Sequence, residues 1–188
     1  ETVVKPLTNE EISLFKETYR ASTISSVIAH AGYLINIGSS NKEIEKKSIQ
    51  SLELELKRCD QLGIPNLILH PGSFRQSTEQ SCIKRIAHNI NRIYEENIRC
   101  TLVIENMAGQ GTTVGYTFEQ LRDILAMIKI SEKIGVCFDT CHAFAAGYDF
   151  SSQQDYNRMW EQFDKIVGLN KLKIIHINNS KTEHGSKI

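Results

Sequence analysis

The chain has 188 residues and no net charge at neutral pH, because 22 Lys and Arg residues balance 22 Asp and Glu residues. We expect residues 1–188 to form a single domain with a substantial core. The balanced charge gives no overall basic field for a nucleic-acid partner, although a local basic patch remains compatible with one. The five cysteines include no C-x-x-C pair, which favours a reducing compartment. No apolar run reaches about 18 residues, so we expect no membrane span.

Short apolar runs alternate with segments of helical periodicity along the chain. The expected helices begin at Thr8, run from Asn41 to Gly63, and then cover about 83–93, 117–128 and 154–167. The expected strands cover 27–30, 67–70, 102–105, 136–139 and 172–176. This alternation is typical of βαβ units around a parallel sheet.

Each expected strand ends in a residue that can bind a metal. These residues are His30, His70, Glu105, Asp139 and His176, at intervals of 40, 35, 34 and 37 residues. A TIM (β/α)8 barrel spreads about 250 residues over eight units and keeps its chemistry at the carboxyl ends of its strands. We therefore predict an α/β fold, an incomplete TIM barrel of about five central β/α units.

The chemistry of this set favours a catalytic metal centre. Strand alternation places each ligand on the same face as the residue two positions before it, which in a barrel is the interior. A mixed nitrogen and oxygen set without thiolate is typical of catalytic rather than structural zinc. Glu105 has two carboxylate oxygens and could bridge two ions, and metal pairs about 3.5–4 Å apart clamp phosphodiesters. A single strand-end histidine is more often structural, but five equivalent positions favour a site.

Residues near the strand ends add further candidates. His142, three residues after Asp139, is a sixth possible ligand in the loop that leaves that strand. Small residues fill three expected loops, 71–73, 108–111 and 145–147, which predicts a broad groove. Tyr33 and Leu34 are expected on its rim. We interpret Cys137 and Cys141 as packing residues, because C-x3-C is not a common zinc spacing.

Four stretches resemble the endonuclease IV family of zinc-dependent apurinic/apyrimidinic endonucleases. They are residues 70–73 (HPGS), 104–111 (IENMAGQG), 135–149 (GVCFDTCHAFAAGYD) and 176–178 (HIN). The resemblance covers essentially the whole chain in order. It implies a TIM barrel with up to three zinc ions that cuts the phosphodiester 5′ to an abasic site in double-stranded DNA and leaves a 3′-hydroxyl.

The resemblance also implies roles for individual residues. His30 and His70 bind one zinc, the catalytic Glu105 bridges to a second, Asp139 and His176 complete the second, and His142 binds the third. Tyr33 and Leu34 match residues that enter the DNA at the lesion. Asn179 replaces the family's usual Asp beside His176. Further ligands of the family would follow Ile188, so we expect the third ion to be held weakly by this chain.

Two other functions remain open from the sequence. One is a divalent-metal sugar isomerase of related barrel architecture, which is expected to use a more oxygen-rich site for Mg²⁺ or Mn²⁺. The other is a barrel remnant that binds metal or DNA without cutting. For the endonuclease we expect a monomer, located in the cytoplasm if the source is bacterial and in the nucleus or an organelle if it is eukaryotic.

Overall fold

The computed structural model describes residues 6–188, which form a five-stranded parallel sheet with helices on one face. In chain order the elements are α1 (Asn9–Ala21), β1 (Ala29–His30), α2 (Lys42–Leu62), β2 (Asn66–Leu69), α3 (Glu79–Ile93), β3 (Thr101–Glu105), α4 (Phe118–Ala126), η1 (Ser131–Lys133), β4 (Ile134–Asp139), α5 (Thr140–Ala146), α6 (Gln153–Ile166), η2 (Leu169–Lys171) and β5 (Leu172–His176). Among these described residues, no helix is both long and apolar enough to cross a bilayer.

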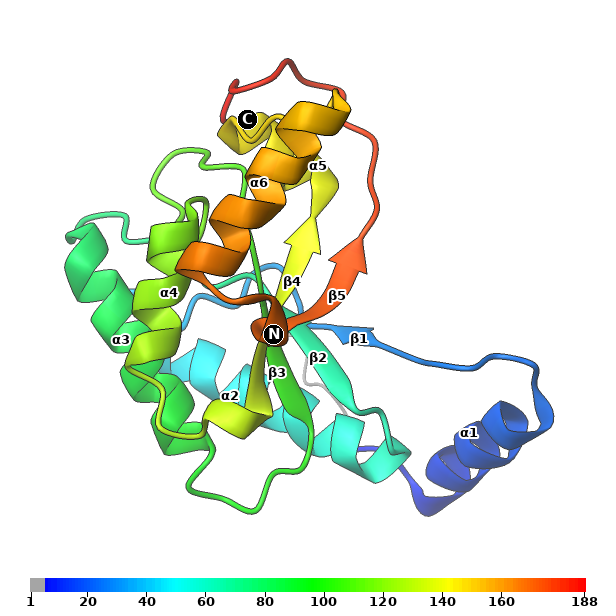
Figure 1. The fold of residues 1–188 in the computed structure, drawn as a ribbon. Coiled ribbons are helices and arrows are strands. Elements are labelled where there is room, and N and C mark those ends of the chain that lie inside the picture. The colour runs from blue at the N-terminus through cyan, green and yellow to red at the C-terminus, as the bar shows by residue number, and fades with distance from the viewer. Residues whose placement is uncertain (1–5) are drawn as a thin grey trace.

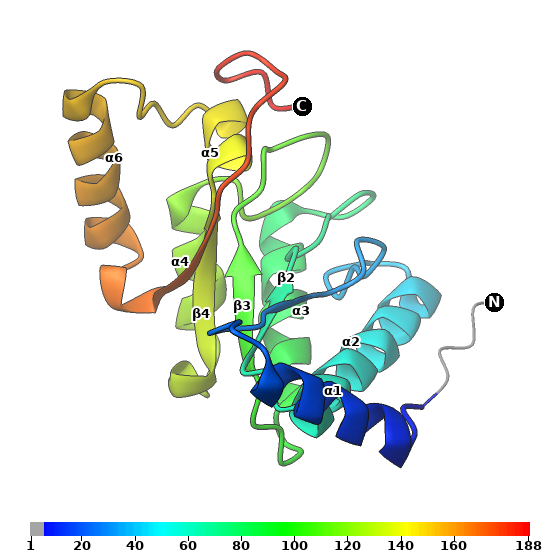
Figure 2. The same cartoon turned by 90° about the vertical axis from the view of Figure 1, so that its right-hand side faces the viewer.

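The strands lie in the order β1-β2-β3-β4-β5, and every neighbouring pair is parallel. Figures 1 and 2 show α2, α3, α4 and α6 gathered on one face of this sheet, while the opposite face is open. This arrangement is five successive strands of a barrel that has not closed, joined by crossovers through α2, α3, α4 and α6. The predicted incomplete TIM barrel is confirmed.

Alternation along the strands builds two separate apolar layers. One set of side chains packs against the helices in the main core, and it comprises Leu67, Leu69, Leu102, Ile104, Val136 and Phe138. The residues between them point to the open face, where Ile68, Val103, Cys137 and Ile174 form a second cluster. Because the period of a strand is two residues, the next positions on that face after Val103 and Cys137 are Glu105 and Asp139. This second cluster therefore packs on the same face of the sheet as the polar residues at the strand ends.

Local signals explain where the first helices begin and end. Thr8 and Glu11 form a capping box at the start of α1, and Asn41 accepts hydrogen bonds from the backbone N–H groups of Glu43 and Ile44 at the start of α2. Gly63, at φ +76°, ends α2 in the left-handed conformation that glycine adopts without strain. These boundaries agree with the sequence prediction, whereas the first strand is shorter than expected and contains only Ala29 and His30.

Helix α5 is the α-helix that the sequence prediction missed among the described residues. Residues 145–147 were expected in a loop, as was His142, but Thr140–Ala146 is helical and Gly147 ends the helix at φ +106°. Asp139, the last residue of β4, caps this helix by accepting a 2.8 Å hydrogen bond from the backbone N–H of His142. A short helix made mostly of small and apolar residues has no polar face to reveal it in the sequence, so the loop assignment was wrong.

Candidate metal centre

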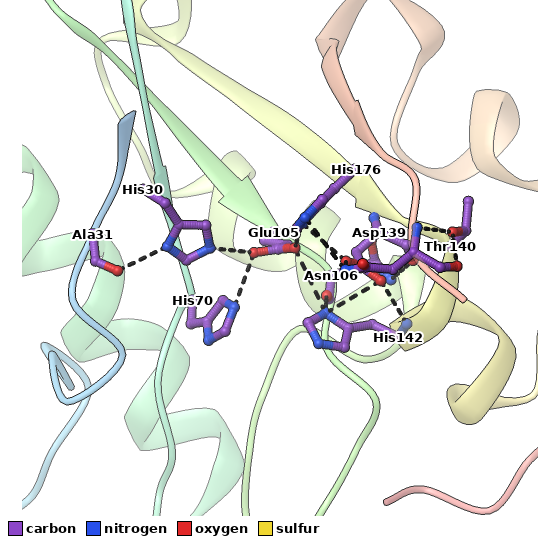
Figure 3. Close-up of polar contacts among 10 residues, drawn as sticks. His30, Ala31, His70, Glu105, Asn106, Asp139, Thr140, His142 and His176 are labelled. Atoms are coloured by element: carbon purple, nitrogen blue, oxygen red, sulfur yellow. Dashed lines mark hydrogen bonds and ion pairs between the residues drawn. The ribbon is translucent and has the colours of Figure 1, made fainter. Parts of the chain in front are cut away.

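The carboxyl edge of the sheet brings all six predicted ligands together (Figure 3). Four of them are the last residues of β1, β3, β4 and β5, one follows β2 directly, and one lies on α5; they are His30, Glu105, Asp139, His176, His70 and His142 respectively. Parallel strands end at the same edge, so residues up to 146 positions apart in the sequence share one site.

The buried carboxylate of Glu105 lies at the middle of this group and is 0% exposed. Its Oε2 atom is 2.9 Å from His30 Nε2 and 3.0 Å from His70 Nε2. Its Oε1 atom faces the other way, 3.0 Å from His176 Nδ1 and 3.8 Å from His142 Nδ1. Each oxygen thus faces a different pair of imidazoles, which is the arrangement that a bridging carboxylate requires.

Asp139 provides a second buried carboxylate on the β4–β5 side, also 0% exposed. Its Oδ2 atom lies 3.0 Å from His176 Nδ1 and accepts a 3.0 Å hydrogen bond from Asn178 Nδ2. Its Oδ1 atom accepts the hydrogen bond from the His142 backbone and is 3.9 Å from the Nδ1 atom of that ring. Asp139 therefore shares His176 and His142 with Glu105.

Two of the four histidine rings are oriented by backbone carbonyl groups. His30 Nδ1 is 2.8 Å from the carbonyl oxygen of Ala31, and His142 Nδ1 is 2.9 Å from that of Asn106. A carbonyl oxygen only accepts hydrogen bonds, so both Nδ1 atoms carry a proton and donate it. In the neutral ring this leaves the lone pair on Nε2, and metal-ligating histidines commonly have this pattern.

His30 gives a direct test of whether the site suits a cation. Its Nδ1 donates to Ala31, yet its Nε2 lies 2.9 Å from the carboxylate oxygen of Glu105, which is also an acceptor. In a neutral ring, the lone pair of His30 Nε2 would face a lone pair of the Glu105 oxygen. A proton or a metal cation between these two atoms is therefore favoured. The hydrogen bond with Glu105 accordingly raises the pKa of His30, by more than burial lowers it. A bound divalent cation would supply the same positive charge, so these residues fit a metal.

The same interactions determine the charge of Glu105. Burial raises the pKa of this carboxyl, but the hydrogen bonds with His30, His70 and His176 outweigh it and hold the pKa well below its ordinary value. The group is therefore ionised and ready to bind a cation. Cys137 lies opposite Glu105 on the neighbouring strand, and burial raises the pKa of its thiol. Cys137 therefore stays a neutral packing residue, as predicted.

Two overlapping sets of side chains have the donors for a metal ion. One consists of His30, His70 and Glu105, and the other of Glu105, Asp139 and His142, with the ligand atoms of each set within 4.8 Å of one another. Glu105 belongs to both. Imidazole and carboxylate donors suit zinc and other first-row transition metals. The individual roles predicted for these residues, including the placing of His142 at a third ion, stay predictions.

The predicted rim residues lie beside this centre. Tyr33 and Leu34 are 80% and 77% exposed, which is unusual for large apolar side chains. Together with His70, Gly72 and Gly111 they line a hollow of about 440 Å³ at the carboxyl edge of the sheet. A groove was expected here from the small-residue loops 71–73, 108–111 and 145–147. The first two line it together with the loop after β1, whereas residues 145–147 do not.

The side chain of Asn36 joins two of these loops. Its Nδ2 donates a 3.0 Å hydrogen bond to the carbonyl oxygen of Ser73, and its Oδ1 accepts a 3.1 Å hydrogen bond from the backbone N–H of the same residue. Ser73 Oγ lies 2.6 Å from Thr112 Oγ1 in the third loop. The segment that carries Tyr33 and Leu34 is thus joined to the loop after β2 directly, and to the loop after β3 through Ser73.

Three asparagines near the ligands were not recognised as site residues from the sequence. Asn36 holds the rim, Asn106 binds the backbone of Asp139, and Asn178 contacts both Asp139 and His176. The period of a strand could have indicated Asn178, two residues after His176, and Asn106 directly follows Glu105. Asn179, which stands where the endonuclease IV family usually has Asp, is exposed.

Comparison with known protein families places the chain in one of them. The sequence model of the family described as xylose isomerase-like TIM barrel matches residues 2–188. The chain belongs to this family. Barrels of this family share the fold, so their individual relatives are more informative about chemistry.

Curated relatives confirm the resemblance to endonuclease IV. The chain is 43% identical over 184 residues to "Probable endonuclease 4" of Campylobacter hominis, covering 96% of this chain and 65% of the relative. It is 39% identical over 182 residues to "Apurinic-apyrimidinic endonuclease 1" of Saccharomyces cerevisiae, covering 95% of this chain and 50% of the relative. The chain therefore spans between half and two thirds of the length of these relatives.

A solved structure gives the same result. Endonuclease IV from Thermus thermophilus superimposes with a TM-score of 0.83 at 32% sequence identity, covering 98% of this chain and 64% of the other. A D-tagatose 3-epimerase-like protein also superimposes, with a TM-score of 0.66 at 20% identity, covering 90% of this chain and 61% of the other. At that identity the second likeness shows the fold alone.

The Asn36 contact predicts a stability effect at Gly72. An alanine Cβ at Gly72 would lie 2.5 Å from Asn36 Oδ1, and φ there is +133°. Gly72→Ala should therefore lower the free energy of unfolding by about 2–4 kcal/mol, from strain and overpacking together. Gly63→Ala is the matched control, because φ is +76° but nothing lies within 4 Å of the added Cβ, and it should cost only about 1–2 kcal/mol. Urea unfolding of both variants measures the difference, and equal losses would contradict the clash.

Proposed function

We propose that the protein is a zinc-dependent DNA-repair endonuclease that hydrolyses the phosphodiester 5′ to an abasic site and leaves a 3′-hydroxyl. The observation that carries this proposal is the division of the buried Glu105 carboxylate, with one oxygen facing His30 and His70 and the other facing His176 and His142. That arrangement can hold two metal ions on either side of one carboxylate. The names of the curated relatives supply the substrate class.

In this proposal His30 and His70 hold one zinc, Glu105 bridges, Asp139 and His176 hold a second, and His142 contributes to a third. Bound zinc ions lower the pKa of water, neutralise charge on a phosphate and stabilise a leaving oxygen. The protein groups do the rest. The carbonyls of Ala31 and Asn106 orient His30 and His142 through their Nδ1 atoms, and the ionised Glu105 and Asp139 supply negative charge to hold the cations.

In this proposal Tyr33 and Leu34, on the rim of the hollow, contact the DNA. Tyr33 and Leu34 are largely exposed beside the hollow that includes His70. Apolar side chains in such positions can enter a DNA duplex between base steps, and a lesion that lacks a base offers them space. We propose that they occupy the gap at the abasic site in double-stranded DNA. We further propose that the enzyme acts as a monomer, in the cytoplasm of a bacterium or in the nucleus or an organelle of a eukaryote.

The sugar-isomerase alternative shares the fold but fits the donor set less well. Four imidazoles surround two buried carboxylates here. Mg²⁺ and Mn²⁺ prefer sites in which oxygen donors dominate. The histidine-rich set is better suited to zinc, which favours the endonuclease over the isomerase.

Glu105→Gln tests the proposed mechanism. Substitution by the neutral amide removes the charge that binds the metal ions, so nicking of a duplex with one tetrahydrofuran abasic analogue should fall by at least about 100-fold, with a loss of bound zinc. Glu45→Gln is the control, because Glu45 is also buried but contacts Lys42 and Asn89, away from the site. Unchanged nicking and zinc content in Glu105→Gln would contradict the bridging role.

The double variant Tyr33→Ala/Leu34→Ala tests the DNA contact. Loss of two apolar groups from the gap should weaken binding to the abasic duplex by about tenfold or more, measured by fluorescence anisotropy. Bound zinc should stay the same, because neither side chain is a ligand. Leu14→Ala/Tyr156→Ala removes similar exposed side chains (65% and 46%) from α1 and α6 and should leave affinity unaltered. Equal affinity in the two double variants would refute the contact.

A further inference from the structure

The side-chain amide of Asn106 forms hydrogen bonds with the backbone of Asp139, at the end of β4 where β3 no longer pairs with it. The β3–β4 pairing ends where Glu105 lies opposite Cys137, and the backbone N–H of Asn106 still donates a 3.1 Å hydrogen bond to the carbonyl oxygen of Cys137. Beyond this point the chain after β3 turns into the groove-forming loop, while β4 continues to Asp139. The backbone of Asp139 has therefore lost its neighbour on that side.

Asn106 supplies both of the hydrogen bonds that the lost strand would have made. Its Oδ1 accepts a 2.6 Å hydrogen bond from the backbone N–H of Asp139, and its Nδ2 donates a 3.2 Å hydrogen bond to the Asp139 carbonyl oxygen. The side chain is buried, at 2% exposure. Only an amide presents one acceptor and one donor in this way, which explains why Asn and not Asp or Leu suits the position.

The main chain of the same residue also orients a histidine. The carbonyl oxygen of Asn106 accepts the 2.9 Å hydrogen bond from His142 Nδ1, which directs the Nε2 lone pair of that ring away from the backbone. Asp139 in turn holds the His142 backbone through Oδ1. Asn106 thus positions Asp139 directly through its side chain (Figure 3). It positions His142 through its own carbonyl oxygen and, indirectly, through Asp139.

The ligands on the other side of Glu105 are positioned without Asn106. His30 is oriented by the carbonyl of Ala31, and His70 follows β2, two strands away from β4. The two hydrogen bonds of the Asn106 amide both go to the backbone of Asp139. Loss of the amide should therefore affect the two halves of the centre unequally.

We infer that Asn106 is a positioning residue that prepares the Asp139 half of the metal centre while leaving the His30 and His70 half unaffected. This inference rests on the metal centre of the proposed function but not on DNA cleavage. Groups that hold a ligand in place typically change metal affinity by about 10- to 100-fold when they are replaced. The expected result is a selective loss of affinity at one half.

Zinc titration of the Asn106→Leu variant, followed by imidazole ¹H–¹⁵N NMR, tests the inference. In the unaltered protein the signals of His30, His70, His142 and His176 should all respond to zinc. In the variant His30 and His70 should respond as before, and the zinc concentration that shifts His142 and His176 should rise by about 10- to 100-fold. Before zinc is added, the His142 Nδ1 proton should exchange with water faster in the variant than in the unaltered protein.

Two further variants separate positioning from general stability. Asn89→Leu removes another buried amide, 1% exposed, whose hydrogen bonds go to Ile37 and Glu45 and to none of the ligands, and its zinc responses should match those of the unaltered protein. Asn106→Ala removes both side-chain hydrogen bonds without adding charge or bulk, so it provides a second variant with the same expected selective loss if Asn106→Leu does not fold. Equal weakening at all four rings, no weakening in either Asn106 variant, or the same selective loss in Asn89→Leu would overturn the inference.

The outcome is separable from that of the proposed function. A protein that fails to nick abasic DNA, yet shows the selective loss, would disprove the endonuclease activity and leave the role of Asn106 standing. If the unaltered protein nicks abasic DNA but the Asn106 variants show no selective loss of zinc affinity, the endonuclease activity stands and the role of Asn106 is disproved. If none of the four histidine signals responds to zinc in the unaltered protein, both the metal centre and the inference about Asn106 are disproved.

Discussion

The ion-pair network around Glu105 is the interaction on which the rest of the site depends. Burying a carboxylate is costly unless charged or hydrogen-bonding partners surround it. Here His30, His70 and His176 lie within 3.0 Å of its two oxygens. Their hydrogen bonds outweigh the effect of burial on its pKa and keep the group ionised. A side chain that is both buried and charged between imidazoles is well suited to bind divalent cations.

The fold supplies this network by simple geometric means. Five parallel strands end at one edge, and their two-residue period brings Glu105 and Asp139 onto the inner face above Val103 and Cys137. Asparagine amides then compensate where the backbone leaves the sheet: Asn106 replaces the lost pairing beside β4, and Asn36 connects the loops of the groove. The ligands are thus fixed by the strands, and the polar groups behind them set their orientation.

Much of this could be predicted from the sequence, because the signals were local or periodic. The capped start of α1, the Gly63 end of α2 and the strand-end ligands follow from residue types and spacing. Helix α5 could not be predicted, because its start depends on Asp139 serving both as strand end and as helix cap. The roles of Asn36 and Asn106 also escaped prediction, since each depends on contacts 33 to 37 residues away that only the folded chain creates.

Anomalous diffraction at the zinc edge, from crystals of the zinc-loaded protein, would show directly whether Glu105 lies between two ions. We expect two strong peaks on opposite sides of the Glu105 carboxylate, one beside the rings of His30 and His70 and the other beside Asp139. Such a pair would show that one buried carboxylate bridges two ions. A single peak, two peaks on the same side of Glu105, or zinc bound only elsewhere on the protein would contradict it.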